Sequence, residues 1–155
     1  MTDNALRELY QEVILDHSRH PRHYGALEDA SHKAEGYNPL CGDKVTVYLK
    51  LGGDGRVADI KFVGKGCAIS QASASMMTEM LRGRSAQEAD RLMKGFLHLV
   101  KGEDASDLPE DDRERLEVMG GISQFPMRVK CATLAWHTFK NAVEEGQNVM
   151  EEGAT

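Results

Sequence analysis

The stretch VTVYLKLGGDGRVADIKF (residues 45–62) decides the fold class, because it predicts a β-hairpin. Apolar and polar residues alternate on both sides of the segment GGDG (52–55), which is a strong turn signal. We expect strands over 44–51 and 56–63. If Leu51 faces Arg56 across the turn, the apolar residues meet on one side of the hairpin. The predicted pairs are then Val45 with Phe62, Val47 with Ile60, and Leu49 with Ala58.

The same register, continued toward the open end of the hairpin, brings two distant cysteines together. It places Cys41 opposite Gly66, directly beside Cys67, and Asp43 follows Cys41 by two residues. Cys67 also begins the next predicted helix, and a helix N-terminus favours a thiolate over a thiol. The hairpin therefore predicts two thiols and one carboxylate in a small volume.

Helical periodicity dominates the rest of the chain. Apolar residues recur every three or four positions in five segments. These are a first helix that stops before Pro21, a second over 69–83, a third opened by the capping box SAQE (85–88), a short fourth from Pro109 to Gly120-Gly121, and a last one from Pro126. Strands early and helices late indicate an α+β fold, and we read residues 1–155 as one domain.

Composition excludes several classes of function. The chain has 155 residues, is 41% hydrophobic and carries a formal net charge of −6 without a basic stripe, which argues against nucleic-acid binding. No apolar run approaches the roughly 18 residues of a membrane span. The N-terminus does not resemble a signal peptide, so we expect a cytoplasmic protein. Three cysteines, an odd number, argue against a disulfide framework.

The third cysteine, Cys131, lies early in the last predicted helix, with Arg128 one turn before it. If this helix docks over the mouth of the hairpin, Cys41, Asp43, Cys67 and Cys131 converge. Three thiolates and a carboxylate suit tetrahedral zinc, and Arg128 would offset part of their charge. No two cysteines form a CxxC pair, so the spacing is equally consistent with three buried core thiols and an ordinary turn carboxylate.

Four segments resemble the U-type iron–sulfur cluster assembly family. They are LYQEVILDHSRHPRHYG (9–25), NPLCGD (38–43), GKGCAISQASASMM (64–77) and FPMRVKCATLAWHT (125–138). The resemblance is strongest to the SufU-type branch, because of the linker and short helix over 101–121 and because Lys130 stands where scaffold members carry a histidine ligand. It implies a small three-stranded antiparallel sheet, including the 44–51/56–63 hairpin, packed against about five helices.

The resemblance also implies a function. SufU-type proteins are zinc-dependent sulfurtransferases that accept persulfide sulfur from a PLP-dependent, SufS-type cysteine desulfurase and relay it to the SufBCD scaffold. Carried over by motif, Cys41, Asp43, Cys67 and Cys131 are the zinc ligands, Cys41 is the sulfur acceptor and Arg128 is a supporting charge. PLP would belong to the partner.

Two alternatives stay open. One is a scaffold that assembles a [2Fe–2S] cluster on the same ligands, and Lys130 argues against it. The other is a binding module with an inert structural zinc. Asp43 argues against this module, because closed structural sites usually contain only Cys and His.

Overall fold

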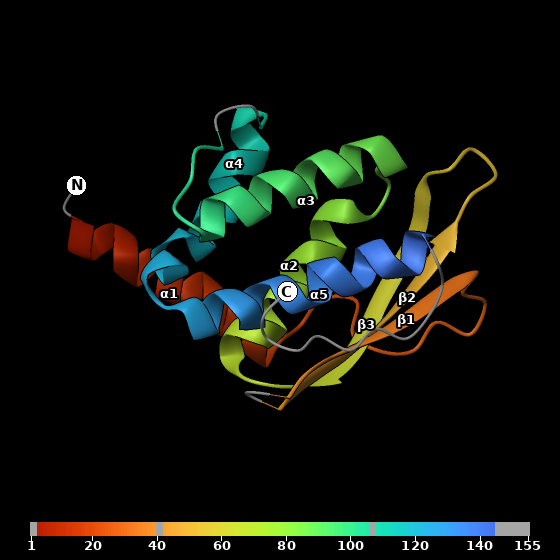
Figure 1. Cartoon of the computed structure of the whole chain (residues 1–155), viewed down its shortest axis with the longest axis horizontal. Helices are drawn as coiled ribbons and strands as arrows, with labels where there is room; N and C mark the ends of the chain where they lie inside the picture. Colours follow the sequence, from red (N-terminus) through yellow and green to blue (C-terminus); the bar gives the residue numbers. More distant parts are fainter. Residues whose placement is uncertain (1–2, 40–41, 106–107, 145–155) are drawn as a thin grey trace.

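The protein folds as a three-stranded antiparallel sheet with its helices packed on one face (Figure 1). The computed structural model describes residues 3–39, 42–105 and 108–144. Strands β1 (His32–Asn38), β2 (Asp43–Leu51) and β3 (Val57–Lys65) lie in the order β1-β2-β3. The helices are α1 (Asp3–Arg19), α2 (Ala68–Leu81), α3 (Ala86–Val100), α4 (Glu110–Leu116) and α5 (Pro126–Glu144), with a 3₁₀ helix η1 (Glu117–Gln124). The expected α+β fold is confirmed.

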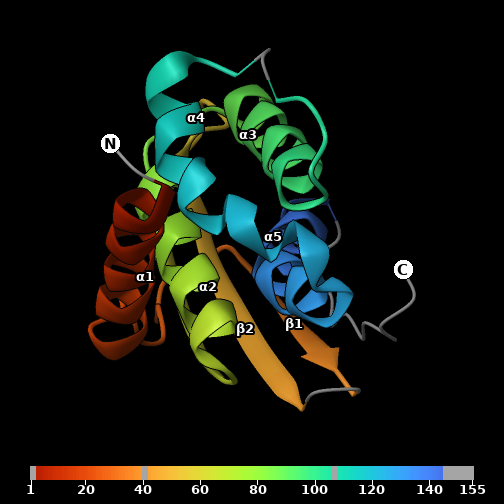
Figure 2. The ribbon, with the colours of Figure 1, turned by 90° about the vertical axis from the view of Figure 1, so that its left-hand side faces the viewer.

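The core lies between the sheet and helices α2 and α5. Alternate residues of β2, Val45, Val47 and Leu49, point toward the helices and are buried. Helix α5 packs on β1 and β2, and α2 packs on β3. Figure 2 shows α2 and α5 in front of the strands, with α1 against the outer side of α2. Trp136 on α5 stacks on Phe96 with 4.7 Å between ring centroids, which joins α3 to this core.

The predicted hairpin register is wrong by two residues. The structure pairs Leu49 with Ile60, Val47 with Phe62 and Val45 with Gly64. The turn lies where it was expected, but Leu51 pairs with Val57 instead of Arg56, and the Gly52 N–H donates to the Arg56 carbonyl at 2.8 Å. The register changes between Lys50 and Leu51, where a β-bulge leaves Ala58 as an extra residue on β3. Because of the bulge, Val57 is buried instead of Ala58, which is exposed.

Helix ends agree with the sequence signals at most positions. Helix α1 ends before Pro21, α5 begins at Pro126, and the Ser85–Glu88 capping box is formed in both directions. The short helix after Pro109 was expected to end at Gly120-Gly121, and this is wrong, since the chain tightens into η1 and stays helical through both glycines. Buried side chains on both sides of them, Met119 and Ile122, hold that segment against the core.

The free edge of β3 is covered by the loop that follows α1. The Gly25 N–H donates to the Phe62 carbonyl at 2.8 Å, and the Phe62 N–H donates to the His23 carbonyl at 3.2 Å. Covering an edge in this way blocks unwanted strand pairing. Within the described part of the chain, none of the helices has both the length and the apolar character needed to cross a bilayer.

Candidate metal centre

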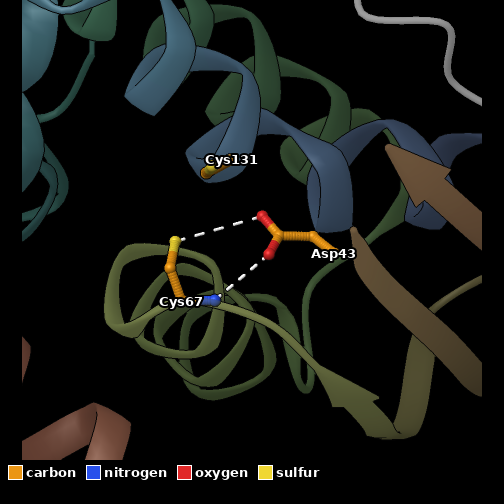
Figure 3. A group of neighbouring side chains, drawn as sticks. All are labelled: Asp43, Cys67 and Cys131. Carbon is orange, nitrogen blue, oxygen red and sulfur yellow. Dashed lines mark hydrogen bonds between the residues drawn. The ribbon is translucent and has the colours of Figure 1, made fainter. Parts of the chain in front are cut away.

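Three potential metal ligands from three different elements meet at one end of the sheet. Asp43 is the first residue of β2, Cys67 immediately precedes α2, and Cys131 lies in the second turn of α5. One ligand atom from each residue lies within 4.8 Å of the other two. Figure 3 shows the three side chains pointing into a common space. Cys41, the fourth expected ligand, lies outside the described residues.

The corrected register explains why Asp43 is so close to Cys67. The last pair of the β2–β3 ladder is Lys44 with Lys65, and one further step leads to Asp43 and Gly66. The register expected from the sequence places Cys41, not Asp43, opposite Gly66. The Cys67 N–H donates to Asp43 Oδ1 at 3.1 Å, and Cys67 Sγ lies 4.0 Å from Oδ2. A Cβ at position 66 would lie 2.5 Å from Oδ1, so the approach requires glycine.

Cys67 has the environment of a thiolate. It is the N-cap of α2, and its sulfur accepts a hydrogen bond from the Ser70 N–H at 3.4 Å. A hydrogen bond from the Cys131 thiol, assisted by the Ser70 N–H, lowers the pKa of Cys67 from 9.0 to about 6, against the opposing effects of burial and the Asp43 charge. Cys67 is therefore mostly deprotonated at neutral pH, which is the form that binds metals.

The three donors differ sharply in exposure. Asp43 and Cys131 are 2% and 4% exposed, whereas Cys67 is exposed. A metal bound here would have a buried side, held by Asp43 and Cys131, and a side near the surface at Cys67.

The donor set fits a tetrahedral ion such as zinc, whose bonds of about 2.0–2.3 Å to oxygen and sulfur place ligands roughly 3.3–3.8 Å apart. The present spacing is close enough for this geometry to form with a small contraction of the side chains.

Arg128 packs on Phe125, and Lys130 borders a cavity. The Arg128 guanidinium lies over the ring of Phe125, 5.4 Å from its centroid, and is exposed. Its expected role as a supporting charge at the metal stays a prediction. Lys130, half-buried, lines a cavity of about 450 Å³ together with Lys101 and His137.

The sequence of residues 17–25, rich in His and Arg, predicts a loop, but its first three residues form the last turn of α1, and the segment has a structural role that the sequence does not reveal. His17 is buried, and its Nδ1 lies 2.7 Å from Ser75 Oγ, to which the Arg22 N–H also donates at 2.8 Å. Burial lowers the pKa of His17. His20 is 78% exposed and pairs with Asp16 at 3.5 Å. The two histidines therefore bind different partners, and Ser75 anchors the loop to α2.

Comparison with known proteins identifies relatives of the whole domain. The model of the family "NifU-like N terminal domain" matches residues 9–132. The zinc-dependent sulfurtransferase SufU of Bacillus subtilis (strain 168) is 43% identical over 151 residues, covering 96% of this chain and 100% of that protein. The iron–sulfur cluster assembly scaffold protein IscU of Streptococcus pyogenes serotype M1 is 38% identical over 148 residues, covering 96% and 91%.

A solved structure agrees with these sequence relatives. The crystal structure of a protein from Fervidobacterium islandicum AW-1, described as an iron–sulfur cluster assembly scaffold protein for the SUF system, superposes with a TM-score of 0.79. It is 37% identical and covers 88% of this chain and 98% of its own. The relatives carry names of two kinds, transferase and scaffold, so the choice between these functions depends on the residues of the site.

Proposed function

The chain belongs to the NifU-like N terminal domain family of U-type iron–sulfur cluster assembly proteins, and we propose that it is a zinc-dependent sulfurtransferase within that family. It takes sulfur from the persulfide of a SufS-type, PLP-dependent cysteine desulfurase and passes it to a SufBCD scaffold. The observation that carries the proposal is the cluster of Asp43, Cys67 and Cys131, with Cys67 at the N-cap of α2, where its sulfur accepts a hydrogen bond from the Ser70 N–H.

In this proposal Cys41 is the fourth zinc ligand and the sulfur acceptor. Zinc, when bound, keeps its cysteine ligands deprotonated at neutral pH. Asp43 and Cys131 are buried, so they are suited to hold the ion while the exposed side of the site changes its ligand. A side chain of the docked partner, such as a histidine, would take the position that Cys41 leaves.

The transfer step needs no oxidant. The Cys41 thiolate attacks the terminal sulfur of the desulfurase persulfide, a new sulfur–sulfur bond forms on Cys41, and the donor's sulfur–sulfur bond breaks. The desulfurase cysteine leaves as a thiolate, as in thiol–disulfide exchange. Because the reactive thiolate is free only when the partner occupies its place, sulfur transfer is restricted to the complex.

One residue supports the transferase over a scaffold for a [2Fe–2S] cluster, and another disfavours an inert structural zinc. Lys130 occupies the position before Cys131, and an ammonium group is not a ligand for iron. Its side chain also lines the neighbouring cavity with Lys101 and His137. An inert structural zinc is disfavoured by Asp43, whose oxygen is a harder donor than the thiolates of closed structural sites.

The test compares zinc-loaded and iron-loaded protein in one desulfurase assay. Protein purified in air should contain one zinc per chain, and the zinc-loaded form should stimulate cysteine turnover while carrying no cluster. Iron should not displace zinc under mild reconstitution, because zinc binds such a site more tightly than Fe²⁺. An inactive zinc form, beside an iron form that holds a stable [2Fe–2S] cluster and donates it to an apo-acceptor, would establish the scaffold function instead.

A further inference from the structure

The sheet has a second face, directed away from α2 and α5, whose side chains form rows across the three strands. Side chains on this face are exposed or half-buried. The strand register defines the rows. From the metal end to the hairpin end they are Tyr37–Lys44–Lys65, Glu35–Thr46–Val63, Lys33–Tyr48–Lys61 and Lys50–Asp59.

This face is positive although the chain as a whole is negative. The rows contain five lysines and two acidic residues, in a chain of net charge −6. The charges at the hairpin end are already paired, since Lys50 contacts Asp29 at 2.6 Å and Asp59 contacts Arg82 at 3.5 Å. The excess positive charge lies on the other four lysines. We call these four the lysine patch: Lys33, Lys44, Lys61 and Lys65.

The patch contains an arrangement that folding alone does not favour. Lys44 lies directly opposite Lys65, and like charges at directly opposed positions destabilise a sheet. Two of the lysines lie over tyrosine rings, Lys44 over Tyr37 at 5.8 Å and Lys33 over Tyr48 at 5.6 Å. An acidic partner would remove the repulsion between Lys44 and Lys65, and the tyrosine rings would supply contact area at such an interface.

One row of the patch, Lys44 and Lys65, lies at the metal end of the sheet. Lys44 follows the ligand Asp43, and Lys65 precedes Cys67 by two residues. Because neighbouring residues of a strand point to opposite faces, Lys44 and Asp43 are separated only by the thickness of the sheet. A partner that binds the patch and extends past this end of the sheet would contact the exposed side of the site, at Cys67.

We propose that the lysine patch docks an acidic surface of the cysteine desulfurase and so aligns its persulfide with the metal centre. This inference rests on the proposed function. A nucleic acid is a less suitable occupant, because the net charge of −6 repels a polyanion at long range, whereas a protein can present a local acidic patch.

The experiment measures the Kd between the full-length zinc-loaded protein and a SufS-type desulfurase, with and without charge reversal. The test variant is Lys44→Glu/Lys61→Glu/Lys65→Glu. The matched control, Lys94→Glu/Lys101→Glu/Lys140→Glu, changes the total charge equally in α3, at its C-cap and in α5. Circular dichroism and thermal unfolding verify that both fold. In about 50 mM salt the patch variant should bind at least about tenfold more weakly than the control, and the difference should shrink strongly in about 500 mM salt.

The steady-state assay adds a second readout. The patch variant should show a raised KM for the protein with kcat at saturation changed by less than about twofold, because its charges guide docking and do not take part in sulfur transfer. Equal Kd values for the two triple variants, or a wild type that does not bind the desulfurase, would overturn the inference.

Two further results distinguish a failure of the proposed function from a failure of the docking inference. Binding that depends on the patch without persulfide formation would contradict the proposed function and leave the docking surface standing. Binding of a short DNA duplex that is lost in the patch variant, with an unchanged Kd for the desulfurase, would assign the patch to nucleic acid and overturn the inference.

Discussion

The main-chain N–H of Cys67 donates a 3.1 Å hydrogen bond to the carboxylate of Asp43, 24 positions earlier in the chain. This bond joins the start of β2 to the start of α2. Cys131 on α5 is the third member of the ligand cluster and lies above the other two in Figure 3. The ligands therefore assemble only when the sheet and both helices are packed together. Metal binding and folding should be coupled for this reason.

Replacing Gly66 by Ala tests the close approach of Asp43. The new Cβ would lie 2.5 Å from Asp43 Oδ1 and 3.1 Å from Ser70 Oγ, and the buried carboxylate has little room to retreat. We expect the free energy of unfolding to fall by about 1–3 kcal/mol and zinc affinity to drop with it. Gly53→Ala is the control, because its Cβ meets nothing within 4 Å. Similar denaturation midpoints for the two variants would contradict the geometry.

Asp43→Asn separates the charge of this ligand from its shape. The amide keeps the size of the carboxylate and an oxygen acceptor for the Cys67 N–H, so the zinc-free variant should fold. Zinc affinity, measured by competition with a chromophoric chelator, should fall by at least about tenfold, since even outer-shell partners contribute that much. Unchanged affinity in Asp43→Asn would remove Asp43 from the ligand set.

The reactivity of Cys67 in the zinc-free protein should depend on pH with a midpoint near its pKa of about 6. The thiolate is present above that value and lost below it, so iodoacetamide labelling, followed by peptide mapping, should be nearly constant from pH 7 upward. Cys131→Ala removes the hydrogen bond that contributes most to the shift, so the midpoint should move to higher pH. A wild-type midpoint near 9.0, the ordinary value, would contradict this environment.

Buried His17 should make the zinc-free protein less stable in acid. Burial lowers the pKa of His17 below its ordinary 6.5, so the unfolded chain binds the proton more readily than the folded one. Stability is therefore retained above 6.5 and falls as the pH drops through that value, until the folded form is protonated as well. His17→Gln keeps a polar partner for Ser75 and should flatten the dependence of Tm on pH between 7.5 and 5.5. Parallel Tm profiles for wild type and variant would exclude this contribution.

Much of the fold was accessible from the sequence because its signals are local. The hairpin turn, the capping box of α3 and the proline boundaries of α1 and α5 depend on residues next to one another in the chain. The pairing register was not accessible from the sequence. The bulge at Ala58 depends on the burial of Val57 in the core, and the alternation of apolar and polar residues does not reveal this burial.

The same limit applies to the candidate site. Motifs gave Asp43, Cys67 and Cys131 as ligands, and the structure brings these three together. The two-residue error in register had put Cys41 where Asp43 lies, opposite Gly66. Strand β1 and the contact of His17 with Ser75 were not located, because both depend on partners far away in the sequence.

The most direct test of the account is to locate the transferred sulfur. Zinc-loaded protein is incubated with a SufS-type desulfurase and cysteine, and persulfide is then mapped on each cysteine by mass spectrometry, with zinc measured in the same sample. We expect one added sulfur on Cys41, zinc retained, and no persulfide in Cys41→Ala, which still folds and binds the desulfurase. Persulfide mainly on Cys67 or Cys131, or transfer that proceeds equally well in Cys41→Ala, would contradict the account.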